Sequence, residues 1–138
     1  MENNSIFIEK LRSSGLRPTK QRIKICKLLF GRKQTFHITI NNLSKILKKD
    51  TSEKISLATK YNTVHSFKKK GYLKEISVNQ NKSYFDTNTS NHHHFLDINT
   101  NELIDLKNED VHNVKIKKRI PGKKINSIEV LVKIENSN

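Results

Sequence analysis

Residues 56–71 read Ser-Leu-Ala-Thr-Lys-Tyr-Asn-Thr-Val-His-Ser-Phe-Lys-Lys-Lys-Gly, and this stretch constrains the fold more than any other. Ser56 suits a helix N-cap and Gly71 suits a helix stop, so the stretch is predicted to be one helix. Its apolar side chains recur at helical spacing and predict one buried stripe: Leu57, Tyr61, Val64 and Phe67. The other side is polar and carries no acid: Thr59, Asn62, Thr63, Ser66, Lys69 and Lys70. Such a helix either enters a DNA major groove or is an ordinary amphipathic helix with a solvated basic face.

Three more helices are predicted ahead of this one. The first covers residues 4–14 and is stopped by Gly15. Thr19 is a suitable N-cap for the second helix, and Thr39 for the third. A polar loop, residues 48–54, then leads into the helix that begins at residue 56.

Two strand-like segments follow the fourth helix. Residues 72–78 and 83–86 are rich in β-branched and aromatic side chains, and residues 79–82 have the composition of a turn. Helices followed by a hairpin predict a winged helix-turn-helix with the hairpin as its wing. We therefore assign residues 1–87 to a winged-helix DNA-binding domain.

The rest of the chain, residues 88–138, is predicted to form a second, smaller unit. Three segments have strand character: residues 95–98, 103–106 and 128–134. A unit of about 50 residues buries too little surface to be stable alone, so it is expected to pack against a copy of itself. A homodimer also suits a DNA reader, because two recognition helices on a two-fold axis match a palindrome.

The charge of the chain points to an anionic partner. Its 138 residues carry a formal net charge of +14 and give a pI near 10.0. Nucleic acid and a membrane surface are the two partners of that kind. Heavy use of Asn, Lys and Ile throughout also fits an AT-rich genome, which weakens the inference from lysine content.

Several other classes of protein are disfavoured. No segment is long and apolar enough to span a bilayer, and the N-terminus lacks the pattern of a secretory signal. The single cysteine, Cys26, excludes an intrachain disulfide and a Cys-x-x-Cys zinc site, and it falls in a predicted apolar stripe. An enzyme is not expected, because no phosphate-cradling glycine loop or paired nucleophile and base is visible. A cytoplasmic protein fits these features best.

Three consecutive histidines, His92–His94, stand just after the predicted domain boundary. On a strand they would alternate, so His92 and His94 would share one face and His93 the other. Two imidazoles on one face suit a metal ion or haem iron, with Asp86 as a possible oxygen ligand. The alternative is a polar linker end without a ligand.

Four motifs in order resemble the ferric uptake regulator family: residues 15–22, 56–63, 82–87 and 92–94. The resemblance runs from about residue 8 to residue 134 and, within the family, is greatest to the alphaproteobacterial iron response regulator branch. It implies an α+β homodimer, with an N-terminal winged helix-turn-helix and a small C-terminal α/β dimerisation domain.

The resemblance also implies how the DNA, an AT-rich inverted repeat, is contacted. Tyr61 would touch a thymine methyl in the major groove, and Arg17 would approach a minor groove or the backbone. Arg22 and Thr59 would sit near phosphates. The full predicted DNA-binding set is Arg17, Arg22, Thr59, Lys60, Tyr61, Asn62 and Thr63. Lys60 stands where the family usually has an aliphatic residue.

For metals, the resemblance places a hinge site at the positions of His37, Asp86 and His93, and a second site at His92. The paired cysteines that hold structural zinc in many members are absent, so no such zinc site is expected. The iron response regulator branch senses iron status through haem. Haem is therefore the favoured ligand, with Fe, Mn or Zn as the alternative. The expected ligand residues are His92, His93, His94, His37 and Asp86.

The leading hypothesis is an iron- or haem-responsive, sequence-specific transcription regulator, either a repressor or an activator, that binds double-stranded DNA as a dimer. Ligand binding near residues 86–94 would change the angle between the two domains. A divalent-metal sensor of the same family is the first alternative. The second is a basic protein that binds nucleic acid without sequence preference, with an affinity that falls steeply with salt.

Overall fold

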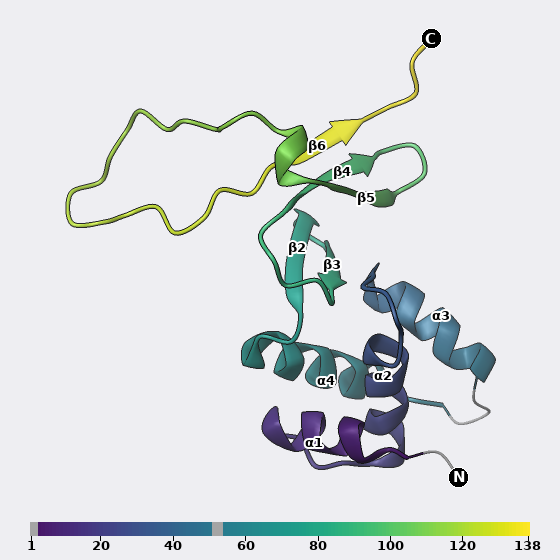
Figure 1. The fold of residues 1–138 in the computed structure, drawn as a ribbon. Coiled ribbons are helices and arrows are strands. Elements are labelled where there is room, and N and C mark those ends of the chain that lie inside the picture. Colours follow the sequence, from purple (N-terminus) through teal and green to yellow (C-terminus); the bar gives the residue numbers. More distant parts are fainter. Residues whose placement is uncertain (1–2, 51–53) are drawn as a thin grey trace. The chain divides into compact units, whose positions relative to one another are not determined.

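The computed structural model describes residues 3–50 and 54–138, and the chain divides into two compact units, Met1–Thr89 and Ser90–Asn138. The first unit contains helices α1–α4 and strands β1–β3, and the second contains β4–β6 (Figure 1). Part of the loop predicted at 48–54, residues 51–53, lies outside the described residues. Within the described part of the chain, none of the helices has the length and apolar character needed to cross a bilayer.

The four helices of the first unit lie where the sequence predicts them. They are α1 (Ser5–Ser13), α2 (Lys20–Phe30), α3 (Ile40–Asp50) and α4 (Leu57–Lys70). Side-chain oxygens cap three of them, as predicted. Thr19 Oγ1 accepts from the Arg22 amide at 3.2 Å, Thr39 Oγ1 from Asn42 at 3.1 Å, and Ser56 Oγ from Thr59 at 3.1 Å.

Gly71 ends α4 in the left-handed region, with φ at 97°. A side chain would be strained there, so glycine at this position fixes where the helix stops. The hydrogen bond from Lys68 Nζ to Glu75 Oε1, at 2.6 Å, then ties the last turn of α4 to the next strand. The same bond, assisted by Ser83, holds the pKa of Glu75 below its ordinary value.

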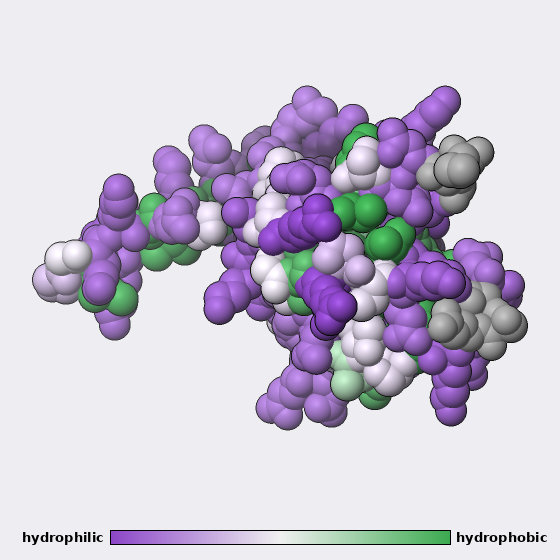
Figure 2. Space-filling model, turned by 90° about the horizontal axis from the view of Figure 1, so that it is seen from below, coloured by the Kyte–Doolittle hydropathy of each residue, from purple (hydrophilic) through white to green (hydrophobic). Residues whose placement is uncertain are grey.

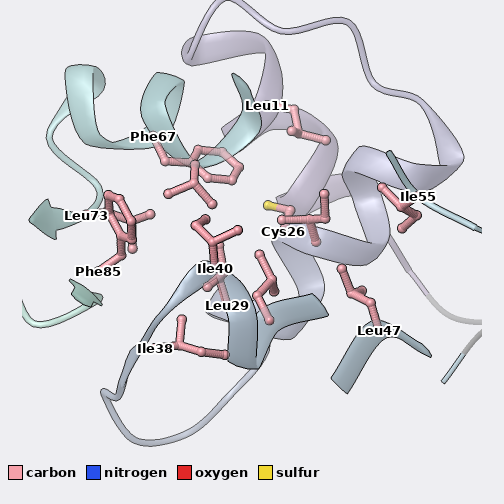
Figure 3. Close-up of a cluster of buried hydrophobic side chains, with 13 residues drawn as sticks. Leu11, Cys26, Leu29, Ile38, Ile40, Leu47, Ile55, Phe67, Leu73 and Phe85 are labelled. Carbon is pink, nitrogen blue, oxygen red and sulfur yellow. The ribbon is translucent and has the colours of Figure 1, made fainter. Parts of the chain in front are cut away.

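A single apolar core holds the helices of the first unit together (Figure 3). Its fully buried members include Leu11 from α1, Leu29 from α2, Leu43 from α3 and Phe67 from α4. Each helix therefore contributes at least one side chain to the same core, which fixes the face that α4 leaves to solvent.

The predicted wing is present as an antiparallel hairpin of β2 (Lys74–Asn79) and β3 (Lys82–Asp86). The sequence did not predict the short strand β1 (His37–Ile38), which pairs with β3 and gives the sheet order β1-β3-β2. Just beyond β3, Thr87 bonds to the backbone of Phe36 in both directions, and its amide donates to Phe36 O at 3.0 Å. The wing is thus anchored to the segment between α2 and α3.

The second unit is a three-stranded sheet in the order β5-β4-β6. The central strand β4 (His93–Asp97) pairs antiparallel with β5 (Glu102–Leu106) and parallel with β6 (Leu131–Ile134). A single 3-10 turn, η1 (Asn108–Asp110), follows β5. Parallel pairing of β4 with β6 requires a crossover, and residues 111–130 provide it without helix or strand.

Cys26 is buried in the core of the first unit, and its thiol lies 3.8 Å from the Phe7 carbonyl oxygen. Burial, only partly opposed by Lys10, raises the pKa of the thiol to about 12. We expect no reaction of the native protein with a thiol-specific dye at pH 8, and one thiol per chain to react in urea.

The raised pKa of Cys26 also determines how the free energy of unfolding changes with pH. An unfolded cysteine ionises near pH 8.5, so between about pH 9 and pH 12 only the unfolded chain loses this proton. The free energy of unfolding should therefore fall as pH rises through that window, and the fall should be smaller in Cys26→Ala. Rapid labelling of the folded protein at pH 8 would show instead that the thiol is accessible.

Candidate metal centre and nucleic-acid interface

The solvent face of α4 differs from the one expected from its pattern. The apolar pattern predicts Leu57 to be in the buried stripe, but Leu57 is 58% exposed. Tyr61 is 42% exposed and stacks on His65, with ring centroids 6.0 Å apart and planes 17° apart. Asn62 is also exposed. The helix therefore presents an aromatic pair and an amide to solvent, and such groups can contact a thymine methyl and an adenine edge in a major groove.

Two of the residues predicted to touch DNA point into the unit instead. Thr63 is 0% exposed, and its hydroxyl donates to the Thr59 carbonyl at 2.7 Å. Lys60 is 9% exposed. Both lie on the side of α4 that carries Val64 and Phe67 into the core, so packing removes them from the accessible face. A DNA contact by Thr63 or Lys60 therefore gains no support from the structure.

The starts of α2 and α4 meet at one open hollow of about 350 Å³. Its lining comprises Thr19, Lys20, Gln21, Arg22 and Thr59. The first turns of both helices carry partial positive charge, and two cations stand beside them. This combination suits a phosphate group.

The predicted phosphate contacts Arg22 and Thr59, far apart in sequence, thus come together at this hollow. The guanidinium of Arg22 donates to the Arg17 carbonyl at 3.0 Å, which joins the segment before α2 to the same region. Lys20 and Gln21 were not predicted. They could have been predicted from their place in the first turn of a capped helix, because an anion binds at that end of a helix.

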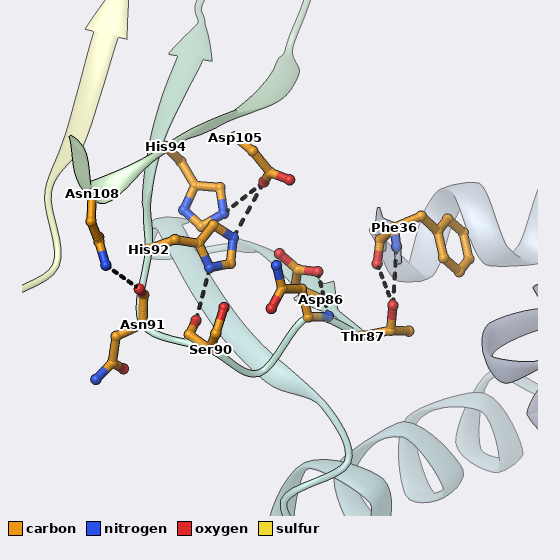
Figure 4. A network of polar contacts seen from close by, with 10 residues as sticks. Phe36, Asp86, Thr87, Ser90, Asn91, His92, His94, Asp105 and Asn108 are labelled. Carbon is orange, nitrogen blue, oxygen red and sulfur yellow. Dashed lines mark hydrogen bonds and ion pairs between the residues drawn. The ribbon is translucent and has the colours of Figure 1, made fainter. Parts of the chain in front are cut away.

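In the second unit, His92 and His94 converge on Asp105 (Figure 4). His92 Nε2 and His94 Nε2 each lie 3.3 Å from Asp105 Oδ1, and the two rings are 4.4 Å apart between centroids. Both histidines are buried, whereas the Asp105 side chain is 49% exposed. The pairing of β4 with β5 sets this geometry, since His94 stands opposite Asp105.

The hydrogen bonding of His92 leaves its other ring nitrogen available to a cation when the ring is neutral. Its Nδ1 lies 2.8 Å from the Ser90 carbonyl oxygen, which can only accept, so Nδ1 carries a proton. In the neutral ring, Nε2 then offers a lone pair toward the carboxylate. Metal–ligand bonds of about 2.0–2.2 Å place neighbouring ligand atoms about 3 Å apart, close to the observed spacing. Two imidazoles and a carboxylate oxygen suit a first-row divalent metal.

His93 lies apart from this group. Its Nδ1 accepts a hydrogen bond from the Val130 amide at 2.9 Å. Alternation from His92, the residue before β4, to His94 therefore separates His93 from the other two, as the strand pattern predicts. Its place in the structure is beside the segment that leads into β6, and its predicted metal contact gains no support from the geometry.

Two predicted ligands, His37 and Asp86, belong to the first unit. They stand opposite each other on β1 and β3. Asp86 is 1% exposed, and its Oδ1 accepts from the Asn88 amide at 2.8 Å. The His37 ring packs edge-on against Tyr84, with centroids 5.9 Å apart. Sequence reasoning brought these two together only through the resemblance, because β1 was not predicted.

The first unit has four helices followed by a hairpin, and the start of α4 lines a hollow that suits an anion. These features define it as a winged helix-turn-helix unit. The model of the ferric uptake regulator family matches residues 13–134, and the chain belongs to that family. The finer assignment, to the iron response regulator branch, stays a prediction.

Similar proteins agree with the family and with the fold. The chain is 34% identical over 99 residues to a peroxide-responsive repressor, PerR, of Staphylococcus aureus, covering 72% of this chain and 65% of the relative. The manganese-bound ferric uptake regulator of Pseudomonas aeruginosa matches 96% of this chain and 99% of its own, at 21% identity and a TM-score of 0.66. The Vibrio cholerae regulator matches 94% and 98%, at 22% identity and a TM-score of 0.69.

Proposed function

We propose that the protein is a metal-responsive transcription regulator that binds DNA through α4. The observation that carries this proposal is the convergence of His92, His94 and Asp105 in a chain whose other unit is a winged helix. These three side chains would bind the metal, and the exposed face of α4 would contact the DNA bases.

A divalent metal is a better fit to the donor set than haem. Haem is favoured only through the resemblance to the iron response regulator branch, whereas the histidine run itself suits haem iron and a metal ion alike. The two imidazoles share one carboxylate oxygen, which is the arrangement expected around a compact cation. Imidazole and carboxylate ligands suit iron, manganese and zinc. When bound, the metal would supply positive charge and a fixed geometry for these side chains.

Metal can change DNA affinity only through a difference in its own affinity for two arrangements of the protein. His37 and Asp86 are the predicted ligands of the first unit, and their substitution tests whether metal binding involves that unit at all. We propose repression with the metal bound, because the relative in Staphylococcus aureus is named a repressor.

We further propose a homodimer on an AT-rich inverted repeat. The second unit is small, and few of its apolar side chains are buried, with Leu96, Leu103 and Leu106 the main ones. A partner copy would add to that core. The DNA titration described next also measures the number of chains bound per duplex, and a value of one would exclude the dimer.

The test is fluorescence anisotropy of a labelled AT-rich inverted repeat at about 0.15 M salt, beside a scrambled duplex. The protein is titrated without metal, with Mn²⁺, with Fe²⁺, with Fe²⁺ followed by peroxide, and with haem. Binding to the repeat that appears only with Mn²⁺ or Fe²⁺ supports the proposal. Reversal by peroxide of the Fe²⁺ form alone would add a peroxide response of the kind named for the Staphylococcus aureus relative. DNA binding that changes only with haem would favour the haem-responsive regulator instead. Equal binding to both duplexes would exclude a sequence-specific regulator.

Tyr61→Ala should reduce the preference for the repeat over the scrambled duplex by about 1–3 kcal/mol. A thymine methyl contact is apolar, so Tyr61→Phe should keep most of that preference. Ile6→Ala is the control, because Ile6 is 71% exposed in the same unit and lies on α1. If Tyr61→Ala weakened binding to both duplexes equally, Tyr61 would not read sequence.

A further inference from the structure

The segment between η1 and β6 concentrates positive charge in an extended and exposed conformation. Residues 111–128, here called the basic arm, contain no acidic residue. Six cations lie within it: Lys115, Lys117, Lys118, Arg119, Lys123 and Lys124. Every residue from 112 to 127 is exposed. In Figure 1 the arm is the wide loop drawn green to yellow, and in Figure 2 it projects at the left of the view.

A turn at the tip of the arm gives it a defined hairpin-like path. The Lys123 amide donates to the Ile120 carbonyl at 3.0 Å, and Gly122 has φ at 77°. Proline followed by glycine at the two central positions is the signature of a type II turn. From residue 111 to Pro121 an extended chain reaches up to about 35 Å. The arm is therefore long enough to carry its cations beyond the edge of its own sheet.

The charge of the arm is not a by-product of high lysine use throughout the chain. Outside the arm, residues 90–138 hold only two basic residues, Lys107 and Lys133. The same remainder holds seven acids: Asp97, Glu102, Asp105, Glu109, Asp110, Glu129 and Glu135. Six of the eight lysines and arginines of this unit thus lie in the arm, while the rest of the unit has two cations against seven acids.

We infer that the basic arm binds the phosphate backbone of double-stranded DNA, as a contact additional to that of the winged helix. This inference rests on the proposed function, because DNA held by α4 raises the effective concentration of phosphate near a tethered arm. Lysine and arginine on an extended, solvated backbone suit phosphates spaced along a duplex, and such contacts carry no sequence preference. Each phosphate contact releases counterions and steepens the salt dependence of binding.

The two lysines outside the arm provide a matched control. Lys117→Gln with Lys118→Gln removes two charges from the arm, and Lys107→Gln with Lys133→Gln removes two charges from the rest of the unit. All four side chains are exposed, so folding should be retained in both variants, which circular dichroism melting verifies. Affinity for the inverted repeat is measured between about 50 and 200 mM salt.

The arm variant should flatten the plot of log affinity against log salt by about 1 for each lysine removed. It should lose affinity equally for the repeat and the scrambled duplex, and the control should keep the wild-type slope. Equal slopes in all three proteins, with preference for the repeat retained, would overturn the arm while leaving the proposed function intact. If the wild-type protein showed no preference for the repeat over the scrambled duplex, the proposed function itself would be overturned.

A membrane surface is the competing partner, because Val114 and Ile116 alternate with lysines along the arm and are 41% and 46% exposed. Vesicles containing about one-third phosphatidylserine separate the two partners. Wild-type binding to these vesicles that is lost in the arm variant, together with an unchanged DNA salt slope, would assign the arm to membranes and overturn the inference.

Discussion

His94→Ala is expected to weaken Mn²⁺ binding by at least about 100-fold. Loss of partners that merely orient metal ligands already costs about 10–100-fold, and His94 is placed as a ligand itself. Its Nε2 lies 3.3 Å from Asp105 Oδ1 and its side chain is buried, so a methyl group in its place leaves that position without a donor atom. Isothermal titration calorimetry of the full chain at fixed pH measures the change.

The neighbouring histidine supplies the control. His93→Asn keeps a side-chain oxygen that can accept the bond now made by the Val130 amide to His93 Nδ1. It should change the Mn²⁺ dissociation constant less than about threefold. Equal losses in His94→Ala and His93→Asn would mean that the histidine run acts through folding, because only one of the two faces the carboxylate.

Asp105→Asn distinguishes a ligand from a structural partner of the histidines. It preserves the shape of the side chain and an acceptor oxygen but removes the charge, so metal affinity should fall while the melting temperature in the absence of metal should not. His37→Asn and Asp86→Asn, assayed in the same way, determine whether residues of the first unit also act as ligands.

Part of this centre could be predicted from the sequence, because the alternation of side chains along a strand depends only on neighbouring residues. Alternation along a strand places His92 and His94 on one face and His93 on the other, and the structure has that arrangement. Asp105 could not be found in this way. Its role depends on the register of β4 against β5, in which His94 faces Asp105, and a pairing register is not a property of either strand alone.

The same limit explains the errors on α4. Its ends were predictable, since the Ser56 cap and the Gly71 stop are local features. Its buried face was not, because Leu57 and Thr63 sit near the edges of the apolar stripe, and contacts with the other helices decide which edge is covered. The structure covers Thr63 and exposes Leu57. The exposure of Tyr61 was expected only from the resemblance.

The crossover to β6 was beyond sequence reasoning for a different reason. Residues 128–134 show the alternation of a strand, and β6 spans Leu131–Ile134. Nothing in that alternation specifies a parallel partner. Its partner, β4, lies earlier in the chain, and residues 111–130, which have no regular structure, connect back to it.

Phe67→Ala is expected to destabilise the first unit by about 3–5 kcal/mol. Phe67 is 0% exposed, and its ring packs edge-on against Phe30 at 5.1 Å and against Tyr72 at 6.4 Å between centroids. It therefore joins α4 to α2 and to the segment that begins the wing. Total stabilities are about 5–15 kcal/mol, so this one truncation removes a large share of the stability that keeps α4 in place. Urea unfolding followed by far-UV circular dichroism measures it.

Leu57→Ala on the same helix is the matched control, and it decides between the two faces of α4. The pattern of the sequence puts Leu57 and Phe67 in one buried stripe, whereas the structure leaves Leu57 58% exposed. The exposed position should cost no more than about 0.5 kcal/mol, as surface substitutions generally do. A cost near that of Phe67→Ala would mean that Leu57 is packed in solution. The helix would then be rotated toward the face expected from its pattern, and Tyr61 would no longer be available to DNA.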